Sequence, residues 1–323
     1  MTAQRHPHLE QQCATASAAH QPTGNQLIED ILDLEIRWAA QQPIWENPEQ
    51  IRLARELLVS CTPLVQLADV DRLHRRLSEA ARGELLVLQA GDCAEDPAER
   101  TAEHVAAKTE LLERLADKLE RAAGVPVLRV GRIAGQFAKP RSKDTESIDG
   151  VKLPIFRGQL VNSPEPDFES RRPDPLRLLS GFSAARDIMA RLGWRPDGAE
   201  SSRPTVWTSH EALLLDYEQP LVRKHSDGRL WLSSTHWPWV GERTRQLHGP
   251  HLALLAQVSN PVSCKVGPSM SADEITLLCD LLDPNREPGR LTLISRMGAD
   301  TVATKLPELV AAVGSAGHPV IWL

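Results

Sequence analysis

The feature that most constrains the fold of this chain is an alternation of short apolar runs with longer helical stretches from residue 84 onward. The runs are rich in Val, Leu and Ile, and they comprise Leu85–Gln89, Pro126–Val130, Thr205–Thr208, Trp237–Val240, Pro261–Val266, Leu291–Ser295 and Pro319–Leu323. The stretches with helical character between them include Glu99–Ala122, Pro175–Leu192, Ala272–Leu282 and Val302–Ala316. Unbroken apolar strands that alternate with helices are typical of a parallel sheet covered by helices.

Two architectures fit this alternation, an open doubly wound sheet and a closed (β/α)8 barrel. The polar residues at the strand ends favour one of them, because six consecutive predicted strands each end at or near an ionisable group. In a barrel the C-terminal ends of the strands converge on one mouth. In an open sheet they lie along an edge, and only those near the switch point share a ligand. We therefore predict an α/β fold, a (β/α)8 TIM-type barrel.

The rest of the chain divides by composition. Residues 1–25 are polar and rich in Gln, His and Ala, and we expect them to form a disordered leader. Residues 26–83 have helical periodicity interrupted by prolines and predict an N-terminal helical extension. Residues 84–323 form the predicted barrel. Within it, residues 140–175 are polar and rich in Pro, Asp and Arg, and a loop of that length is usually functional or contains short elements.

Composition also narrows the class of protein. The formal net charge of −6 gives no basic footprint for nucleic acid or for an anionic membrane. No run of roughly 18 apolar residues is present and the N-terminus lacks a signal-peptide pattern, so neither membrane insertion nor secretion is expected. The cysteines are odd in number and dispersed, which suits a reducing compartment, and we expect a cytoplasmic protein.

The side chains at the predicted strand ends are rich in cations: Arg132, Lys139, Arg141, Arg243, Lys265 and Arg296. Arg binds carboxylate and phosphate oxygens in a two-pronged geometry, whereas Lys supplies a compact charge. Several such groups around one mouth repel one another unless an anionic ligand compensates them. The set therefore predicts a phosphorylated and carboxylated small molecule, or two of them, as ligand.

Three other residues near these ends carry potential chemistry. Glu211 and Glu242 suit proton transfer or a place near a metal, and Cys93 suits a soft metal ligand. Each also has an ordinary interpretation, since a single Cys is more often a small buried residue and a single Glu more often a structural ion-pair partner. His210 precedes Glu211 on a strand and faces the opposite side, which predicts a packing or supporting role.

Motifs at these strand ends resemble those of a known family. They are Q-A-G-D-C-A-E at 89–95, G-R-I-A-G-Q-F-A-K-P-R-S at 131–142, S-H-E-A-L-L-L-D-Y-E at 209–218, W-V-G-E-R-T-R-Q at 239–246, K-V-G-P at 265–268, D-P-N-R-E-P-G-R-L-T-L-I-S-R-M-G at 283–298 and G-H-P-V-I-W at 317–322. In this order they resemble class II DAHP synthases, and the resemblance covers nearly the whole chain from residue 26. Many independent motifs in one order make a chance match very rare.

The resemblance implies a (β/α)8 barrel with N-terminal helices, a divalent metal of the Mn or Co type, and the first committed step of the shikimate pathway. In that step phosphoenolpyruvate condenses with erythrose 4-phosphate. Matched position by position, Cys93 corresponds to a metal ligand and Glu211 to an acidic residue near the reacting centre. The phosphoenolpyruvate positions are Arg132, Glu242, Arg243, Lys265 and Arg296, and the erythrose 4-phosphate positions are Lys139, Arg141 and Ser142.

The implied mechanism begins with a metal that polarises the aldehyde oxygen of erythrose 4-phosphate. C3 of phosphoenolpyruvate then attacks the aldehyde carbon, and positive character develops at C2. Water adds at C2, and phosphate leaves by cleavage of its C–O bond. The cations position both anionic substrates and stabilise the departing phosphate.

The sequence departs from the family pattern in two respects. The family continues beyond the seventh strand with a His, a Glu and an Asp that complete the metal site, and with an eighth strand, whereas this sequence ends at Leu323. We therefore expect an incomplete barrel of seven strands, weak metal binding through Cys93 alone, and exposed strand edges. In addition, Gln159 replaces an expected Asp, and Pro238 lies in a predicted central strand, where proline removes a ladder donor unless a bulge accommodates it.

Three hypotheses follow from these observations. The chain is a DAHP synthase, or it is a catalytically dead paralogue that binds phosphoenolpyruvate or partners a complete homologue, or it is a barrel enzyme of other chemistry. The matched motifs favour the first two over the third, and we expect little or no turnover from the isolated chain. A homo-oligomer, feedback regulation and the choice between primary and secondary metabolism stay open at this point.

Overall fold

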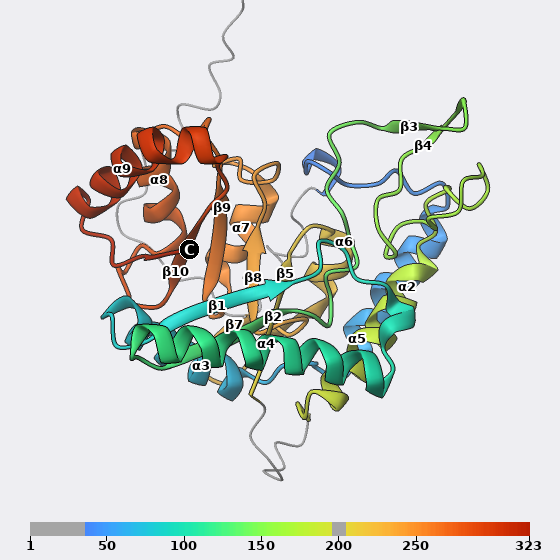
Figure 1. Cartoon of the computed structure of the whole chain (residues 1–323). Coiled ribbons are helices and arrows are strands. Elements are labelled where there is room, and N and C mark those ends of the chain that lie inside the picture. The colour runs from blue at the N-terminus through green and yellow to red at the C-terminus, as the bar shows by residue number, and fades with distance from the viewer. Residues whose placement is uncertain (1–35, 196–204) are drawn as a thin grey trace, which may run out of the picture.

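A parallel β-sheet that curls into part of a barrel lies at the centre of the molecule (Figure 1). The computed structural model describes residues 36–195 and 205–323. Its main sheet has seven strands in the order β1-β2-β5-β8-β9-β10-β11, and every neighbouring pair is parallel. The strands are β1 (Leu86–Gly91), β2 (Val127–Arg132), β5 (Trp207–Glu211), β8 (Trp237–Val240), β9 (Val262–Val266), β10 (Leu291–Ser295) and β11 (Ile321–Trp322).

This architecture confirms the predicted fold class, an incomplete TIM-type barrel. Each predicted apolar run contains or overlaps one strand of the sheet, and the runs at β8 and β10 match residue for residue. No described strand pairs with the outer edge of β1 or of β11, so the curled sheet has two open edges in the part of the chain that the structure describes.

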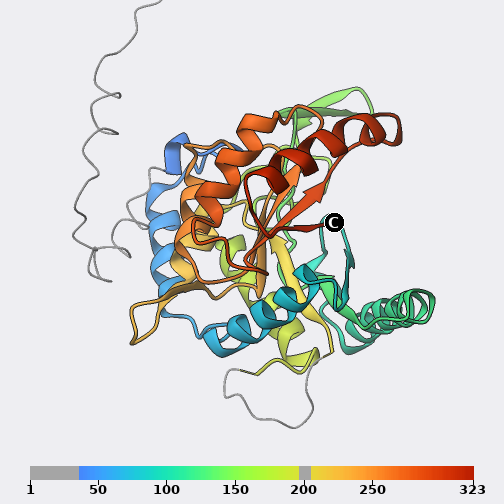
Figure 2. The same ribbon diagram turned by 90° about the vertical axis from the view of Figure 1, so that its left-hand side faces the viewer.

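Helices cover the outer face of the sheet. They are α4 (Ala102–Ala123), α5 (Leu176–Arg191), α7 (Pro250–Gln257), α8 (Ala272–Leu282) and α9 (Ala299–Ser315). Local sequence signals set the ends of α4, where the Thr101 hydroxyl accepts the His104 N–H and Gly124 ends the helix at a φ of 72°. Figures 1 and 2 show α8 and α9 at one end of the curled sheet and α4 along β1 at the other.

The N-terminal extension packs on the barrel, and its second α-helix closes the N-terminal ends of the strands. Its described part contains η1 (Ile36–Trp38), α2 (Pro48–Ser60) and α3 (Leu67–Ala81), while the expected leader lies outside the described residues. On α3, Leu73 and Leu77 are fully buried. The Ser78 hydroxyl donates to the carbonyl of Pro288 in the loop before β10. Helix α3 therefore seals one end of the barrel, and the opposite end carries the C-terminal ends of the strands.

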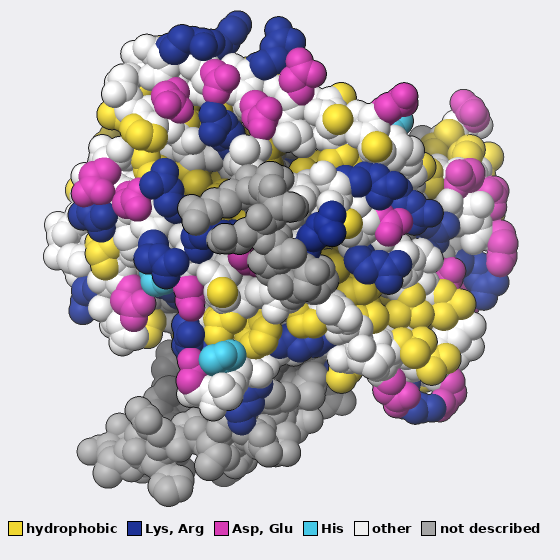
Figure 3. All heavy atoms as spheres, turned by 90° about the horizontal axis from the view of Figure 1, so that it is seen from below, with side chains coloured by type: hydrophobic (Ala, Val, Ile, Leu, Met, Phe, Trp, Pro, Cys, Tyr) yellow, Lys and Arg dark blue, Asp and Glu magenta, His cyan; other side chains and the backbone are white. Residues whose placement is uncertain are grey.

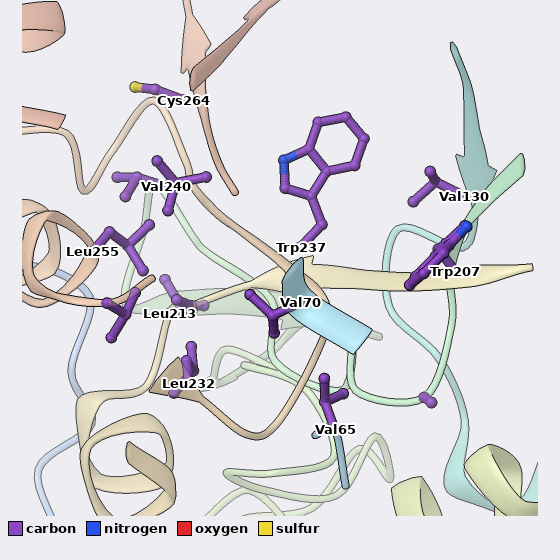
Figure 4. Packing of buried hydrophobic residues seen from close by; sticks show 14 of the residues in the cluster. Val65, Val70, Val130, Trp207, Leu213, Leu232, Trp237, Val240, Leu255 and Cys264 are labelled. Atoms are coloured by element: carbon purple, nitrogen blue, oxygen red, sulfur yellow. The ribbon is translucent and has the colours of Figure 1, made fainter. Parts of the chain in front are cut away.

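The core runs without interruption from α3 into the sheet. Figure 4 shows Val70 of α3, Val130 of β2, Trp237 of β8 and Cys264 of β9 among its packed side chains. Trp237 and Trp239 are both fully buried. Buried aromatic rings of this size contribute much of the packing around β8, at the centre of the sheet.

Several short elements were not predicted from the sequence. The long polar loop contains a hairpin of β3 (Thr145–Ile148) and β4 (Val151–Pro154), as the expectation of hidden short elements allowed. The others follow β1 or lie between β5 and β8: η2 (Pro97–Glu99), α6 (Leu215–Glu218), η3 (Gln219–Leu221), β6 (Val222–Lys224) and β7 (Leu230–Leu232). Helix α7 was missed because its short run is apolar on most sides and lacks a clear period.

Pro238 lies in a central strand, as the sequence predicted. Pro238 is accommodated in β8 because β9 pairs only with Trp239 and Val240, while Pro238 lies opposite His210 of β5.

Across residues 36–195 and 205–323, no helix combines the length and apolar character that a membrane crossing requires. The face seen from below carries Lys and Arg side chains interspersed with Asp and Glu (Figure 3).

Candidate active site

An indole flanked by two cations lies at the C-terminal ends of the central strands. Arg132 ends β2 and Lys265 lies near the end of β9, while Trp239 lies on β8, between β5 and β9 in the sheet. The Arg132 guanidinium carbon lies 5.1 Å from the centroid of the Trp239 ring, and the Lys265 ammonium lies 4.9 Å from it. Both distances suit cation–π contacts. The structure thus brings together two cations that are 133 positions apart in the sequence.

Neither of these cations has a polar side-chain partner among the described residues. Lys265 makes no side-chain hydrogen bond or ion pair there, and the Nε of Arg132 is buried without a partner. Burial lowers the pKa of Lys265, and the positive charges of Arg132 and Arg296 lower it further, whereas Glu211 opposes the shift. A desolvated, unpaired cation favours an anion strongly, because a bound anion restores the charge compensation that water no longer supplies.

Glu211, the last residue of β5, places a buried carboxyl group beside these cations. Its Oε1 atom has no hydrogen-bond partner in the described part of the chain. Burial raises the pKa of Glu211, and the positive charges of Lys265, Arg132 and Arg243 act in the opposite direction. The backbone at Gly241 comes very close, since a Cβ there would lie 2.0 Å from Oε1. A carboxyl whose pKa is raised by burial holds its proton more readily than an exposed one, which suits acid–base chemistry.

Cys93 and Arg296 lie at the rim of the same mouth. Both are exposed, and both act electrostatically on Lys265. The exposed thiol rules out the interpretation of Cys93 as a small buried packing residue. Arg296 is held through its backbone, whose N–H donates to the Val266 carbonyl at 2.8 Å.

The segment after β2 contributes Lys139, Arg141 and Ser142. The Ser142 hydroxyl accepts hydrogen bonds from Nε and Nη2 of Arg243 at 3.1 and 2.6 Å, which joins this segment to the end of β8. The backbone N–H of Arg141 donates to Oε1 of Gln41 at 2.7 Å, so the N-terminal extension also holds the segment. Lys139 is half-buried, and its side chain makes no hydrogen bond or ion pair with any described residue.

Glu242 differs from the other predicted site residues because its carboxylate is fully engaged inside the protein. Arg245 binds both oxygens, at 3.0 and 2.9 Å, the Gly267 N–H donates at 2.6 Å, and the Ser269 hydroxyl donates at 3.1 Å. Burial opposes ionisation of Glu242, but Arg245 and these hydrogen bonds outweigh it and lower the pKa. Arg245 is itself paired a second time, with Glu274 of α8.

His210 occupies the supporting position that the strand alternation predicted. It is buried, and its Nε2 lies 2.9 Å from Oε1 of Glu218 on α6. Sequence reasoning did not assign roles to Trp239 and Arg245, although both lie within the W-V-G-E-R-T-R-Q motif. Alternation along the strand places Trp239 on the opposite side of β8 from Pro238 and Val240, and this was the available signal for Trp239. No comparable local signal identifies Arg245.

A divalent metal does not fit the described residues. They contain no group of three or more His, Cys, Asp or Glu side chains arranged to hold an ion. We therefore derive no chemical step through a metal from these residues.

Comparisons with known proteins point in one direction. Residues 33–195 and 183–323 match the model of the Class-II DAHP synthetase family. The chain is 51% identical over 299 residues to a Pseudomonas fluorescens protein named "probable phospho-2-dehydro-3-deoxyheptonate aldolase", covering 92% of this chain and 75% of that protein. It is 40% identical to a phospho-2-dehydro-3-deoxyheptonate aldolase of Streptomyces coelicolor, covering 88% of this chain and 74% of that one. It is 35% identical to the phospho-2-dehydro-3-deoxyheptonate aldolase AroG of Mycolicibacterium smegmatis, and the match covers 88% of this chain and 72% of that protein.

Proposed function

The chain belongs to the class-II DAHP synthetase family, a family of enzymes, and we propose that its mouth binds phosphoenolpyruvate and erythrose 4-phosphate for condensation to DAHP and phosphate. The observation that carries this proposal is the pair of cations on Trp239. Arg132 and Lys265 are half-buried, and neither has a polar side-chain partner among the described residues. Phosphoenolpyruvate, with its carboxylate and its phosphate, offers two anionic groups to such a pair.

The two subsites are assigned by strand. Phosphoenolpyruvate is bound by four cations at the strand ends: Arg132 at β2, Lys265 at β9, Arg296 after β10 and Arg243 after β8. Lys139, Arg141 and Ser142 hold the phosphate of erythrose 4-phosphate. The hydrogen bonds from Arg243 to Ser142 support this arrangement, because they fix the two subsites next to each other. Holding both substrates in one orientation removes much of the entropic barrier to their reaction.

Glu211 supplies the acid–base chemistry at the reacting centre. C3 of phosphoenolpyruvate attacks the aldehyde carbon, a C–C bond forms, and the aldehyde oxygen takes up a proton. Water then adds at C2 and gives up a proton. The new C2 hydroxyl passes its own proton to the departing phosphate as the C–O bond to phosphate breaks and the ketone forms. The raised pKa of Glu211 suits proton exchange in this sequence, and the surrounding cations stabilise the phosphate as it leaves.

Glu242 serves the site through its neighbours. Its carboxylate already has Arg245, Gly267 and Ser269 as partners, so we assign it the task of tying the loop after β8 to the loop after β9. Lys265 lies two residues before Gly267, and Arg243 lies between Glu242 and Arg245. The ion pair thereby sets the positions of two substrate-binding cations.

A second candidate function is binding of phosphoenolpyruvate without turnover. The family resemblance implies a divalent metal, whereas the described residues offer Cys93 without companion ligands. A chain that holds phosphoenolpyruvate in this way is a binding subunit or a partner of a complete homologue.

One pair of measurements separates the candidates. Phosphoenolpyruvate is titrated into the purified chain by calorimetry, and phosphate release is then assayed with both substrates and Mn²⁺. Phosphate release that requires both substrates supports condensation. Binding without release supports the second candidate, and the absence of both binding and release overturns the two together.

A further inference from the structure

A buried carboxylate outside the predicted site holds two parts of the mouth together. Glu95 lies two residues after Cys93 and is 3% exposed. Its carboxylate accepts hydrogen bonds from three consecutive backbone N–H groups, those of Ala134 at 3.0 Å, Gly135 at 2.9 Å and Gln136 at 2.7 Å. In return, the Glu95 N–H donates to the Gln136 carbonyl at 2.7 Å. The segment after β1 is thus bound to the loop after β2 at four points.

The loop needs such a partner because its backbone is irregular. Ala134 has a φ of 67°, in the left-handed region that residues other than glycine rarely adopt. Its neighbour Gly135 packs directly on the ring of His210, where a Cβ would lie 2.2 Å from Nδ1. Three consecutive buried N–H groups in such a turn have no strand or helix to accept them, and the Glu95 carboxylate supplies the acceptors.

The same loop reaches the reacting centre through Gln136. The Gln136 side chain is buried, its Oε1 accepts the backbone N–H of Glu211 at 3.0 Å, and its Nε2 donates to the Ala138 carbonyl at 3.1 Å. A continuous series of hydrogen bonds therefore runs from Glu95 through Gln136 to Glu211. The chain then continues from Ala138 directly into Lys139, the first residue of the second subsite.

We infer that Glu95 is a positioning residue: by fixing the loop of residues 134–136, it sets the placement of Glu211 and of the segment that begins at Lys139. The consequence for ligand binding rests on the proposed function, whereas the placement of Glu211 does not. Glu95 contacts neither substrate, and it acts through the loop and Gln136.

The test compares Glu95→Gln with two controls. Gln has nearly the same shape, but its NH₂ group replaces one acceptor oxygen and faces backbone donors. Leu73→Ala removes a fully buried side chain of α3 at the opposite end of the barrel and controls for general loss of stability. Glu99→Gln changes a carboxylate in the same segment whose side-chain partner is Lys108.

Backbone amide hydrogen exchange, measured by NMR, distinguishes a positioning role from a general contribution to stability. A general loss of stability speeds exchange throughout the protein, whereas loss of positioning speeds it selectively in the loop and at Glu211. We expect the amides of residues 134–136 and of Glu211 to exchange at least about tenfold faster in Glu95→Gln than in Leu73→Ala of matched thermal stability. Exchange in Glu99→Gln should equal that of the wild type. Equal exchange at Glu211 in the Glu95→Gln and Leu73→Ala variants overturns the inference.

Calorimetric titration with phosphoenolpyruvate measures the effect of the same variants on ligand binding. We expect binding to Glu95→Gln to weaken about tenfold, which corresponds to 1.4 kcal/mol, with Glu99→Gln unchanged. Faster exchange with wild-type affinity shows that the loop is loosened without consequence for the site, and overturns the role in ligand placement. If the wild type itself does not bind, the proposed function fails, and the exchange at Glu211 still decides whether Glu95 positions that residue.

Discussion

Glu242 and Arg245 form a forked ion pair at the C-terminal end of β8, with two nitrogen–oxygen distances of 3.0 and 2.9 Å. The side chains are only 16% and 8% exposed, so the pair is largely shielded from water. The Glu242 carboxylate also accepts the Gly267 N–H, which ties the ends of β8 and β9 to each other. This geometry supports a role for Glu242 in fixing the positions of the loops at the mouth.

Glu242→Gln should destabilise the fold by about 3 kcal/mol, because the change leaves Arg245 largely buried with one counter-ion fewer. The pKa of Glu242 lies below its ordinary value of 4.5. Its stabilising contribution is therefore present above pH 4.5 and is lost as the pH falls through the lowered folded-state pKa. Urea unfolding at several pH values checks this. Loss of phosphoenolpyruvate binding at unchanged stability would show instead that the Glu242 carboxylate touches the ligand.

Lys265 should make ligand binding depend on pH. Its pKa is lowered from the ordinary 10.5, mainly by burial. The affinity for phosphoenolpyruvate should fall as the pH rises through this lowered pKa, and binding in that range should take up a proton. Lys265→Arg stays charged and should move the fall to higher pH. Calorimetry in buffers of different ionisation enthalpy measures the proton uptake, and an identical pH profile for the two proteins contradicts the assignment.

Glu211→Gln should stabilise the chain at pH 7.5. Because burial raises the folded-state pKa of Glu211 above 4.5, its contribution to stability is present below pH 4.5 and is lost as the pH rises through the raised pKa. Gln imitates the protonated form and removes this loss. Removing one negative charge should also tighten anion binding roughly fivefold, from a Coulomb energy on the order of 1 kcal/mol. Thermal melts at pH 7.5 and pH 4 check the first effect, and a lower melting temperature at pH 7.5 speaks against it.

Gly241→Ala should disturb the placement of Glu211, because the added Cβ would lie 2.0 Å from Oε1. We expect a loss of about 1–3 kcal/mol in stability, as for overpacking elsewhere in protein cores. Gly314→Ala is the matched control, since it lies in α9 with open space around its Cβ position and should gain roughly 0.5–1 kcal/mol. Urea unfolding of both variants measures the difference. Equal stability of the two would mean that Gly241 does not constrain the carboxyl group.

The fold could be predicted from the sequence because the central strands are buried on both faces. Such strands appear as continuous apolar runs, and β8 and β10 were therefore placed residue for residue. The short hairpin of β6 and β7 and helix α7 gave no comparable signal, because a few residues cannot establish a period. Their positions depend on tertiary packing.

The sequence predicted that several cations lie together at the candidate site, but it did not predict the contacts that support them. Arg132, Lys265 and Arg296 were placed by the convergence of strand ends in a barrel. The engagement of Glu242 by Arg245 could not be foreseen, since adjacent charges in a motif do not show which of them face each other. The Glu95 contacts depend on the left-handed backbone at Ala134, for which the sequence carries no local mark. The hydrogen bond from the Arg141 N–H to Gln41 joins residues 100 positions apart, so it could not be predicted from local sequence either.

Arg132 and Lys265 together should bind an anionic substrate, and calorimetric titration of phosphoenolpyruvate tests this most directly. The wild type should bind, and the double variant Arg132→Met, Lys265→Met should lose at least about a hundredfold in affinity, since charge-assisted hydrogen bonds contribute roughly 1.5–3 kcal/mol each. Arg229→Met changes a cation at the opposite end of the barrel, paired with Asp71, and should bind as the wild type does. Equal affinity of the wild type and the double variant, or no binding by the wild type, would contradict a role for these two cations in substrate binding.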